Sequence, residues 1–348
     1  MGLTLYVDGD RWRAHMKSVA SSHPGIVPVA KGNGYGFGIA RLARKAAWLG
    51  VDTLAVGTYD EVAGAAARFD GSILVLSPWR PFEQRAVFEN HVIHTVGRIS
   101  DLQELSSRDG RPRVVLERMT SMLRHGLSAR ELREAGELVS THDSGVAVEG
   151  VAIHLPMTQG SHMSEVERLM TDVVAAGLPT NRVYVSHLTD TELESLRSSY
   201  PDFDLRPRIG TQLWLGDRGA LSVKATVLDA HPVERGDVFG YRGRTAPKNG
   251  TILIVSGGTA HGIGLEAPPG NSSLKARAAA IAKGGLDAAG FVRSPYNIGG
   301  KQRLFAEPPH MQASMLFLPH GAHVPEVGDE VDVRVRFTAT SFDQTVIS

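Results

Sequence analysis

The sequence predicts an α/β protein in which a (β/α)8 barrel is followed by a mostly antiparallel β domain. From about residue 24 to residue 220, short apolar runs alternate with helix-like segments. After residue 222, Gly and Pro turns separate short segments that alternate between polar and apolar residues. A lysine also stands at the end of the first apolar run, followed by a glycine-rich loop. We therefore expect a barrel over residues 1–222 and a β domain over residues 223–348.

The predicted barrel strands are short and almost continuously apolar, which is typical of parallel strands that are buried on both faces. They are IVPVA (26–30), TLAVG (53–57), SILVLS (72–77), VVLE (114–117), GVAIH (150–154) and VYVSH (183–187). Two of the segments between them, residues 39–50 and 164–177, place apolar residues at helical spacing and end on a glycine. The number of such units favours a closed barrel over an open sheet, although spacing alone leaves both possible.

The residue pattern in the last third of the chain predicts β structure. Residues 223–243 and 249–258 alternate in strand fashion around turns, and residues 328–339 alternate polar and apolar residues almost perfectly. Residues 273–285 form a helical patch, which we interpret as part of a loop or an insertion.

Composition excludes several classes of function. The 348 residues include 37 basic and 37 acidic side chains, so the formal net charge gives no reason to expect nucleic acid or an anionic membrane as a partner. No apolar run is long enough for a membrane span, and the N-terminus does not resemble a signal peptide. The absence of cysteine excludes disulfides, thiolate metal sites and a cysteine nucleophile. We expect a cytoplasmic enzyme.

The most informative stretch is VPVAKGNGYGFG, residues 27–38. In a parallel barrel, the carboxyl ends of the strands face the active site, and Lys31 stands at such an end. A lysine sheltered from water there can lose its proton and attack a carbonyl, and pyridoxal phosphate is the cofactor that such a lysine holds covalently. The glycines allow backbone to approach a ring and a phosphate closely. On position alone, a surface lysine ahead of a flexible loop is the more ordinary interpretation.

This stretch resembles the cofactor-lysine motif of the alanine racemase family, Lys-x-Asn-x-Tyr-Gly-His-Gly. The matching residues are Lys31, Asn33, Tyr35, Gly36 and Gly38. Phe37 replaces the histidine of the motif. The resemblance implies a pyridoxal-phosphate barrel followed by a β domain, and amino-acid racemase activity. It also implies a head-to-tail homodimer in which each active site takes residues from the partner's β domain.

The resemblance continues in order along the barrel. Arg124, in TSMLRHGL, stands where the family binds the substrate carboxylate, and a guanidinium suits that group. Glu117 stands where the family often has a carbamylated lysine that holds this arginine, and it supplies a negative charge without modification. His154 matches the histidine that stacks on the pyridine ring. Ser186 and Thr189 flank the position whose hydroxyl binds the phosphate, and either could serve.

The segment RIGTQLWLG (208–216) strongly resembles the family pattern Arg-x-Gly-Ile-x-x-Tyr-Gly. By this resemblance Arg208 donates to the pyridine nitrogen and keeps it unprotonated, which makes the ring a weaker electron sink and restrains transamination. Gly210 and Thr211 would offer backbone N–H groups to the phosphate, and Tyr35 its phenol.

The pattern is less complete in the predicted β domain. Met311 matches the methionine of a Met-Asp pair that reaches the partner's substrate, but Gln312 replaces the aspartate. The tyrosine that acts as the family's second base is replaced by Thr259, and His261 stands at the position of a neighbouring aspartate. A threonine hydroxyl is a much poorer acid–base group, and loss of one base costs roughly 10²–10⁴ in rate.

Three interpretations follow from this replacement. In the first, His261, Tyr241 or Tyr296 serves the second face and the chain racemises an amino acid. In the second, the reaction has changed to one-face proton exchange, decarboxylation or racemisation of an unusual amino acid. In the third, the chain binds the cofactor without turnover. A metal-dependent aldolase with the same fold fits less well, because residues 320–330 offer only a weak metal-ligand signal, so we expect no metal.

Overall fold

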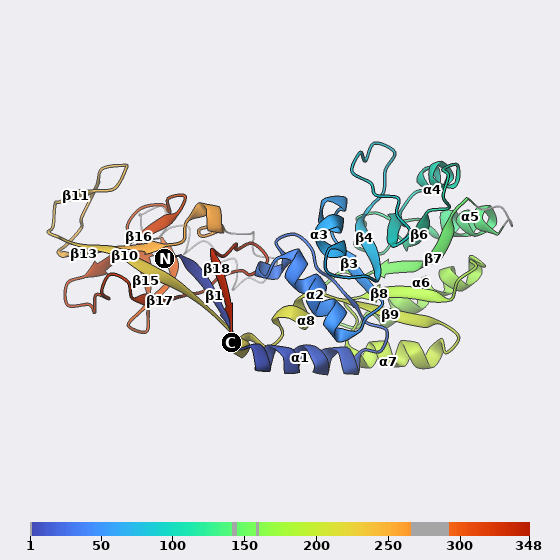
Figure 1. Ribbon diagram of the computed structural model, residues 1–348, viewed down its shortest axis with the longest axis horizontal. Coiled ribbons are helices and arrows are strands. Elements are labelled where there is room, and N and C mark those ends of the chain that lie inside the picture. Colours follow the sequence, from blue (N-terminus) through green and yellow to red (C-terminus); the bar gives the residue numbers. More distant parts are fainter. Residues whose placement is uncertain (1, 141–144, 158–159, 266–291) are drawn as a thin grey trace. The chain divides into compact units, whose positions relative to one another are not determined.

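The computed structural model describes residues 2–140, 145–157, 160–265 and 292–348. The chain divides into two compact units (Figure 1). One is Ala14–Gly216, and the other combines Met1–Arg13 with Asp217–Ser348. The helical patch predicted over residues 273–285 lies outside the described residues.

Eight parallel strands of the first unit form a barrel, which confirms the predicted fold. Their order is β2-β9-β8-β7-β6-β5-β4-β3, and a parallel bridge between Val29 and Ala55 brings the two edges together. The strands are β2 (Val27–Pro28), β3 (Thr53–Val56), β4 (Ser72–Pro78), β5 (Val92–Val96), β6 (Arg113–Arg118), β7 (Ala147–His154), β8 (Arg182–Ser186) and β9 (Asp204–Ile209).

Helices lie around the outside of these strands (Figure 1). The α-helices are α1 (Gly9–Ser22), which begins in the other unit, α2 (Ile39–Leu49), α3 (Val62–Ala66), α4 (Ile99–Ser106), α5 (Ala129–Val139), α6 (Met163–Ala175), α7 (Asp190–Ser199) and α8 (Thr211–Leu215). Short 3-10 turns are η1 (Gly34–Gly36) and η2 (Tyr59–Glu61). Helix α2 ends at Gly50, whose φ of 73° is the left-handed conformation that glycine adopts without steric cost.

Two barrel strands were missed in the sequence, and buried polar residues are the reason. Strand β5 contains His94, which is buried and bonded to the hydroxyl of Tyr59 at 2.7 Å. Strand β9 contains Arg206 and Arg208, both buried, and Arg206 is neutralised by Asp52. Each polar side chain has a partner, so these strands are stable inside the barrel although their composition does not look apolar.

Apolar side chains fill the barrel interior. The cluster consists of Val27, Val29, Ala55, Leu74, Ile93, Val115, Ala152 and Tyr184. Its members come from strands all around the ring, so the barrel is a packed core rather than a channel. This packing fixes the strand ends on which the loops of the mouth stand.

The second unit is built on a mostly antiparallel eight-stranded sheet, as predicted. Its order is β13-β16-β15-β14-β17-β10-β1-β18, and β13 also pairs with β10, which closes six strands into a ring. The strands are β1 (Leu3–Val7), β10 (Leu221–Val233), β13 (Gly250–Ser256), β14 (Arg293–Ile298), β15 (Lys301–Phe305), β16 (Ala313–Pro319), β17 (Glu330–Val333) and β18 (Gln344–Ile347). The remaining elements are a small hairpin, β11 (Val238–Phe239) with β12 (Arg244–Thr245), and the turns η3 (Arg218–Ala220) and η4 (Thr259–His261).

The division of the chain differs from the predicted boundary at the N-terminus. Residues 1–13 were expected in the barrel, but β1 pairs with β10 from Leu3 opposite Ala225 to Val7 opposite Leu221. Strand β1 also pairs in parallel with β18. A strand that pairs with partners more than 200 residues away leaves no local signal in the sequence.

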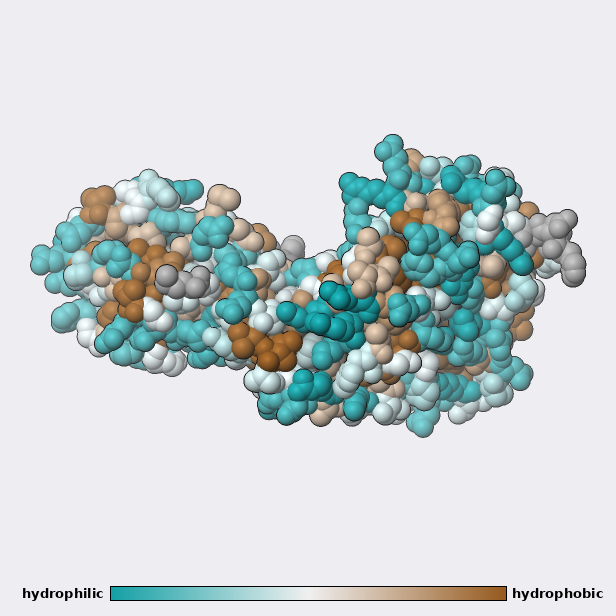
Figure 2. All heavy atoms as spheres, viewed as in Figure 1, coloured by the Kyte–Doolittle hydropathy of each residue, from teal (hydrophilic) through white to brown (hydrophobic). Residues whose placement is uncertain are grey.

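Among the described residues, no helix is long and apolar enough to cross a membrane. Figure 2 shows polar side chains over most of the visible face of the barrel unit, with apolar side chains in small separate areas.

Candidate active site

The residues predicted for the barrel site converge at the carboxyl ends of its strands. Lys31 follows β2, Arg124 lies in the loop after β6, and His154 ends β7 opposite Ser186 at the end of β8. Arg208 is the penultimate residue of β9. The carboxyl ends of parallel strands meet at one mouth of a barrel, so the fold gathers side chains that are up to 177 positions apart in the chain.

In the single chain, Lys31 is exposed at this mouth. The sequence had predicted a lysine that is sheltered from water. The pKa of Lys31 is nevertheless lowered, first because the surrounding barrel partly desolvates the ammonium group, and then because Arg124 and Arg208 repel it. Glu61 acts in the opposite direction. The Lys31 amine is thus more readily deprotonated, and more nucleophilic at neutral pH, than an ordinary surface lysine.

His154 is held neutral at the same place. Burial, and after it the charges of Arg208 and Arg124, lower the pKa of His154 to about 2. Its ring lies 4.9 Å, between centroids, from that of His187. His187 has a φ of 66°, and its Nδ1 donates to the carbonyl of Leu155 at 2.7 Å. The mouth therefore contains an uncharged flat ring near two arginines.

Arg208 is buried and pinned from two sides. Its Nε donates to the hydroxyl of Ser186 at 3.0 Å, and its Nη2 donates to the carbonyl of Ile153 at 3.2 Å. An arginine held by such bonds keeps its charge and its orientation.

The two candidate hydroxyls, Ser186 at the end of β8 and Thr189 after it, have different environments. The Thr189 hydroxyl is the N-cap of α7: it accepts from the Glu192 backbone N–H at 3.3 Å and lies 2.9 Å from the Glu192 carboxylate. The Ser186 hydroxyl accepts from Arg208, so its own proton remains available for an acceptor at the mouth. The geometry favours Ser186.

Tyr35, Gly210 and Thr211 form a second group beside β2 and β9. Tyr35 is buried with a φ of 55°, and burial raises its pKa to about 12 although the Thr211 side chain acts against this. Its phenol therefore stays protonated at neutral pH. A Cβ on Gly210 would lie 2.0 Å from the phenol oxygen, so only glycine allows the Tyr35 hydroxyl to lie against this backbone.

Glu117 lies beside Arg124, as the sequence predicted. The Glu117 carboxylate is buried, 3.6 Å from Nη2 of Arg124 and 3.3 Å from Nδ1 of His125. A buried carboxylate is stable only next to cations or hydrogen-bond donors, so Glu117 supplies a fixed negative charge beside the arginine.

Glu61 was not predicted as part of the site. Its carboxylate accepts from the backbone N–H of Gly32 at 2.7 Å and from that of Gly57 at 2.6 Å. It thereby ties the loop after Lys31 to the end of β3. No motif in the sequence links position 61 to position 32, and only the fold brings them together.

The predicted residues of the β unit separate into exposed and buried ones. Thr259, Met311 and Gln312 are exposed and line a cavity of about 640 Å³, together with Tyr241 and His310. These are the residues for which the sequence predicted contact with a substrate.

His261 and Tyr296 are buried, and both ring nitrogens of His261 and the hydroxyl of Tyr296 have polar partners. Nδ1 of His261 accepts from the Gly258 backbone N–H at 3.2 Å, and its Nε2 lies 3.0 Å from the Asp343 carboxylate. The Tyr296 hydroxyl donates to the carbonyl of Gly257 at 2.8 Å, and burial raises its pKa. The geometry supports the predicted acid–base role for neither residue.

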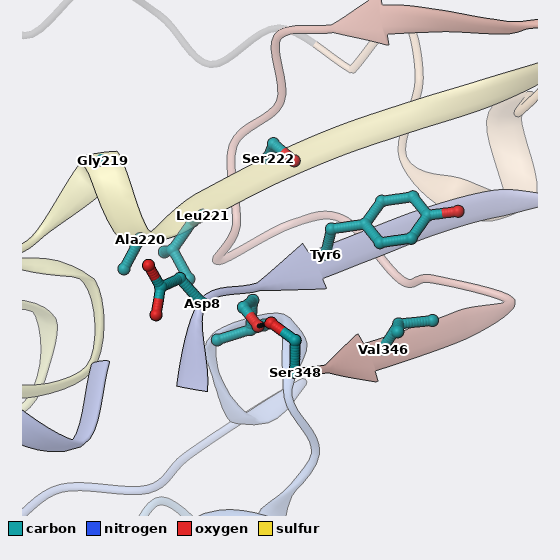
Figure 3. Close-up of a pocket in the computed structure, with 9 residues that line it drawn as sticks. Tyr6, Asp8, Gly219, Ala220, Leu221, Ser222, Val346 and Ser348 are labelled. Atoms are coloured by element: carbon teal, nitrogen blue, oxygen red, sulfur yellow. Dashed lines mark hydrogen bonds between the residues drawn. The ribbon is translucent and has the colours of Figure 1, made fainter. Parts of the chain in front are cut away.

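A second cavity in the β unit, of about 250 Å³, offers less chemistry (Figure 3). Tyr6 and Asp8 are on its wall and point away from each other (Figure 3). The Asp8 carboxylate accepts from the backbone N–H of Arg11 at 3.0 Å, so it caps the start of α1. Among the residues that line this cavity, no base lies beside a nucleophile. In the described parts of the chain, no group of three or more acidic, histidine or cysteine residues could hold a metal ion.

Comparison with known proteins identifies the family. The sequence model of the alanine racemase N-terminal domain matches residues 7–203, more than half of the chain. This chain belongs to the alanine racemase family. It is 26% identical over 280 residues to an alanine racemase of Mycolicibacterium vanbaalenii, an alignment that covers 72% of this chain and 70% of that protein. It is 31% identical over 155 residues to an alanine racemase of Listeria monocytogenes, 42% of that protein's length.

Solved structures of the family share the fold. An alanine racemase from Bartonella henselae with covalently bound pyridoxal phosphate superposes with a TM-score of 0.74 at 17% identity, covering 100% of this chain and 99% of that one. An alanine racemase from Streptomyces lavendulae gives a TM-score of 0.73 at 19% identity, covering 100% and 97%.

The lowered pKa of Lys31 can be measured in the protein without any cofactor. We expect Arg124→Gln to raise the Lys31 pKa, because it removes a repelling cation, and Glu61→Gln to lower it further, because it removes a stabilising carboxylate. Competitive reductive methylation over a pH series, read at Lys31 by mass spectrometry, measures both shifts. Lys301 in β15 is the internal control, and its labelling curve is expected to stay in place. A Lys31 midpoint that does not move in the Arg124 variant would contradict the electrostatic explanation.

Proposed function

We propose that this chain is a pyridoxal-phosphate-dependent amino-acid racemase, acting as a homodimer whose active sites are shared between subunits. The observation that carries the proposal is the cluster of Lys31, Arg124, Arg208 and neutral His154 at one barrel mouth. Family membership supports the class of reaction. A substrate related to alanine but not identical to it stays an open alternative, because Gln312 and Thr259 differ from the family pattern.

The residues at the mouth fit pyridoxal phosphate. Lys31, whose pKa is lowered, would hold its aldehyde carbon, and His154 would offer an uncharged ring to its pyridine ring. Arg208, pinned by Ser186 and Ile153, would donate to the ring nitrogen. The phosphate would take donors from Ser186, the Tyr35 phenol and the backbone at Gly210 and Thr211, where the missing Cβ of Gly210 leaves room.

Each residue would then have a defined task. When bound, pyridoxal phosphate stabilises the negative charge that develops at Cα of an amino acid as its proton leaves. Arg124, steadied by Glu117, would bind the substrate carboxylate and present Cα to Lys31. The Lys31 amine would take the Cα proton from one face or return it there. Glu61 would keep the Lys31 loop in place through its two backbone hydrogen bonds.

The second face of the substrate would be served by the β unit of the partner subunit. The cavity lined by Thr259, Met311 and Gln312 supports this arrangement, because these are the positions that the family resemblance assigns to the partner's substrate. A cytoplasmic location stays a prediction from the sequence.

Racemisation predicts a specific isotope pattern. Purified protein supplied with pyridoxal phosphate and either L- or D-alanine in D₂O is expected to form the opposite enantiomer with deuterium at Cα. Lys31→Ala should lower this rate by about 10³ or more, since it removes both the covalent attachment and one base, whereas Lys301→Ala should not change it. Deuterium uptake with retained configuration would indicate one-face exchange. Absence of uptake from alanine and a panel of other amino acids would indicate a protein that binds the cofactor without turnover.

Mutation can distinguish the roles of the Ser186 and Thr189 hydroxyls. Ser186→Ala is expected to weaken the affinity for pyridoxal phosphate by roughly 10-fold or more, because it removes a donor to a charged phosphate. Thr189→Ala is expected to leave that affinity unchanged and to destabilise the fold by about 1 kcal/mol through loss of the α7 cap. Equilibrium titration with the cofactor and thermal unfolding measure the two effects, and a reversed pattern would reassign the phosphate contact to Thr189.

A further inference from the structure

A histidine–carboxylate pair borders the cavity of the β unit. Nε2 of His310 lies 2.5 Å from Oε1 of Glu307. The Glu307 side chain is 2% exposed, while that of His310 is 27% exposed and lines the cavity. The carboxylate is therefore anchored inside the unit, and the imidazole reaches from it toward open space.

Backbone hydrogen bonds place His310 next to the position of the missing tyrosine. The Thr259 backbone N–H donates to the carbonyl of His310 at 2.8 Å, and that of Ala260 donates to the carbonyl of Met311 at 3.0 Å. His310 thus lies between Thr259 and Met311 on the wall of one cavity. Both neighbours are positions that the family resemblance places at the substrate.

The chemistry of this pair suits proton transfer. Glu307 accepts a hydrogen bond from Nε2 of His310, which fixes the tautomer in which Nδ1 is the acceptor. In the described part of the chain, Nδ1 of His310 has no hydrogen-bond partner, so it is available to a ligand in the cavity. Carboxylate, imidazole and open cavity together are the arrangement of a general base.

The other candidate acid–base residues of the β unit are weaker. His261 and Tyr296 are fully engaged inside the unit. Tyr241 is 87% exposed, and its ring centroid lies 4.5 Å from that of His310. Its backbone N–H donates to Glu307 at 3.3 Å, so Glu307 holds the Tyr241 backbone as well as the His310 ring.

We propose that His310, oriented by Glu307, is the acid–base residue that serves the second face of the substrate in place of the tyrosine absent at position 259. The proposal rests on the racemase function above. In one direction, Nδ1 of His310 takes the proton from Cα and the Lys31 ammonium delivers a proton to the opposite face. In the other direction the two residues exchange tasks, so no proton is gained or lost over the reaction.

The test separates the two faces by isotope exchange. His310→Gln is expected to lower racemisation of alanine by roughly 10²–10⁴. It should abolish deuterium uptake from only one enantiomer, while uptake from the other, which depends on Lys31, continues. His323→Gln is the matched control, because His323 is exposed and does not line the cavity. Free imidazole is expected to restore part of the lost exchange in His310→Ala, which a purely structural role would not allow.

Two further variants complete the test. Glu307→Gln is expected to slow exchange on the same face of the substrate as His310→Gln does. Free imidazole should restore part of the exchange only in the double variant, in which His310 is also replaced by alanine. Tyr241→Phe keeps the ring contact and should retain exchange from both enantiomers.

The outcomes distinguish this proposal from the proposed function. If the His310→Gln variant keeps exchange from both enantiomers, or if the Tyr241→Phe variant alone loses one face, His310 is not the second base although the racemase function stands. If the unmodified protein carries the cofactor on Lys31 but exchanges neither enantiomer, the racemase function fails and this assignment fails with it.

Discussion

Mutual repulsion among basic side chains at the barrel mouth is the constraint on which the rest of the site depends. Lys31 and His154 both have lowered pKa values, first because burial desolvates their charged forms and then because Arg124 and Arg208 repel them. Two carboxylates offset only part of this positive charge. Glu117 pairs with Arg124, and Glu61 accepts from the backbone N–H of Gly32. Such a mouth is most stable with an anion in it. It makes the Lys31 amine easier to deprotonate and keeps the His154 imidazole uncharged at neutral pH. A phosphate, a carboxylate and a nucleophilic lysine can therefore act in the same small space.

The loops that carry the residues of the barrel mouth include strained backbone conformations. Tyr35, Leu123 and His187 have positive φ angles of 55°, 52° and 66°, and all three lie in loops that follow barrel strands. Such conformations cost about 1–3 kcal/mol each and persist only where the surroundings determine them. Here the packed interior fixes the strand ends, and hydrogen bonds such as those of Glu61 and His187 fix the loops. Three of the four described non-glycine residues with a positive φ thus lie in loops at the carboxyl ends of barrel strands.

The sequence predicted what depends on local pattern and missed what depends on long-range pairing. Apolar runs and the glycine-rich loop were enough to place Lys31, His154 and Ser186 at strand ends, whereas Arg208 was predicted only from the family resemblance. Strands β5 and β9 were missed because buried His94 and the β9 arginines obtain their partners only in the fold. The same reason applies to β1, which joins the β unit, and to Glu61. His261 looked available in the sequence, but the fold gives both of its nitrogens partners.

The two halves of the proposed reaction rest on different kinds of support. For the barrel face, a motif series, the geometry of the mouth and family membership agree, whereas the face served by the β unit rests on one cavity and one histidine–carboxylate pair. The central claim is that Lys31 holds the cofactor covalently, and reduction of the loaded protein with borohydride followed by peptide mass spectrometry tests it most directly. We expect a single stable pyridoxyl adduct, on the peptide that contains Lys31. An adduct on another lysine would contradict this claim. So would a loaded protein whose cofactor can still be washed away after borohydride treatment.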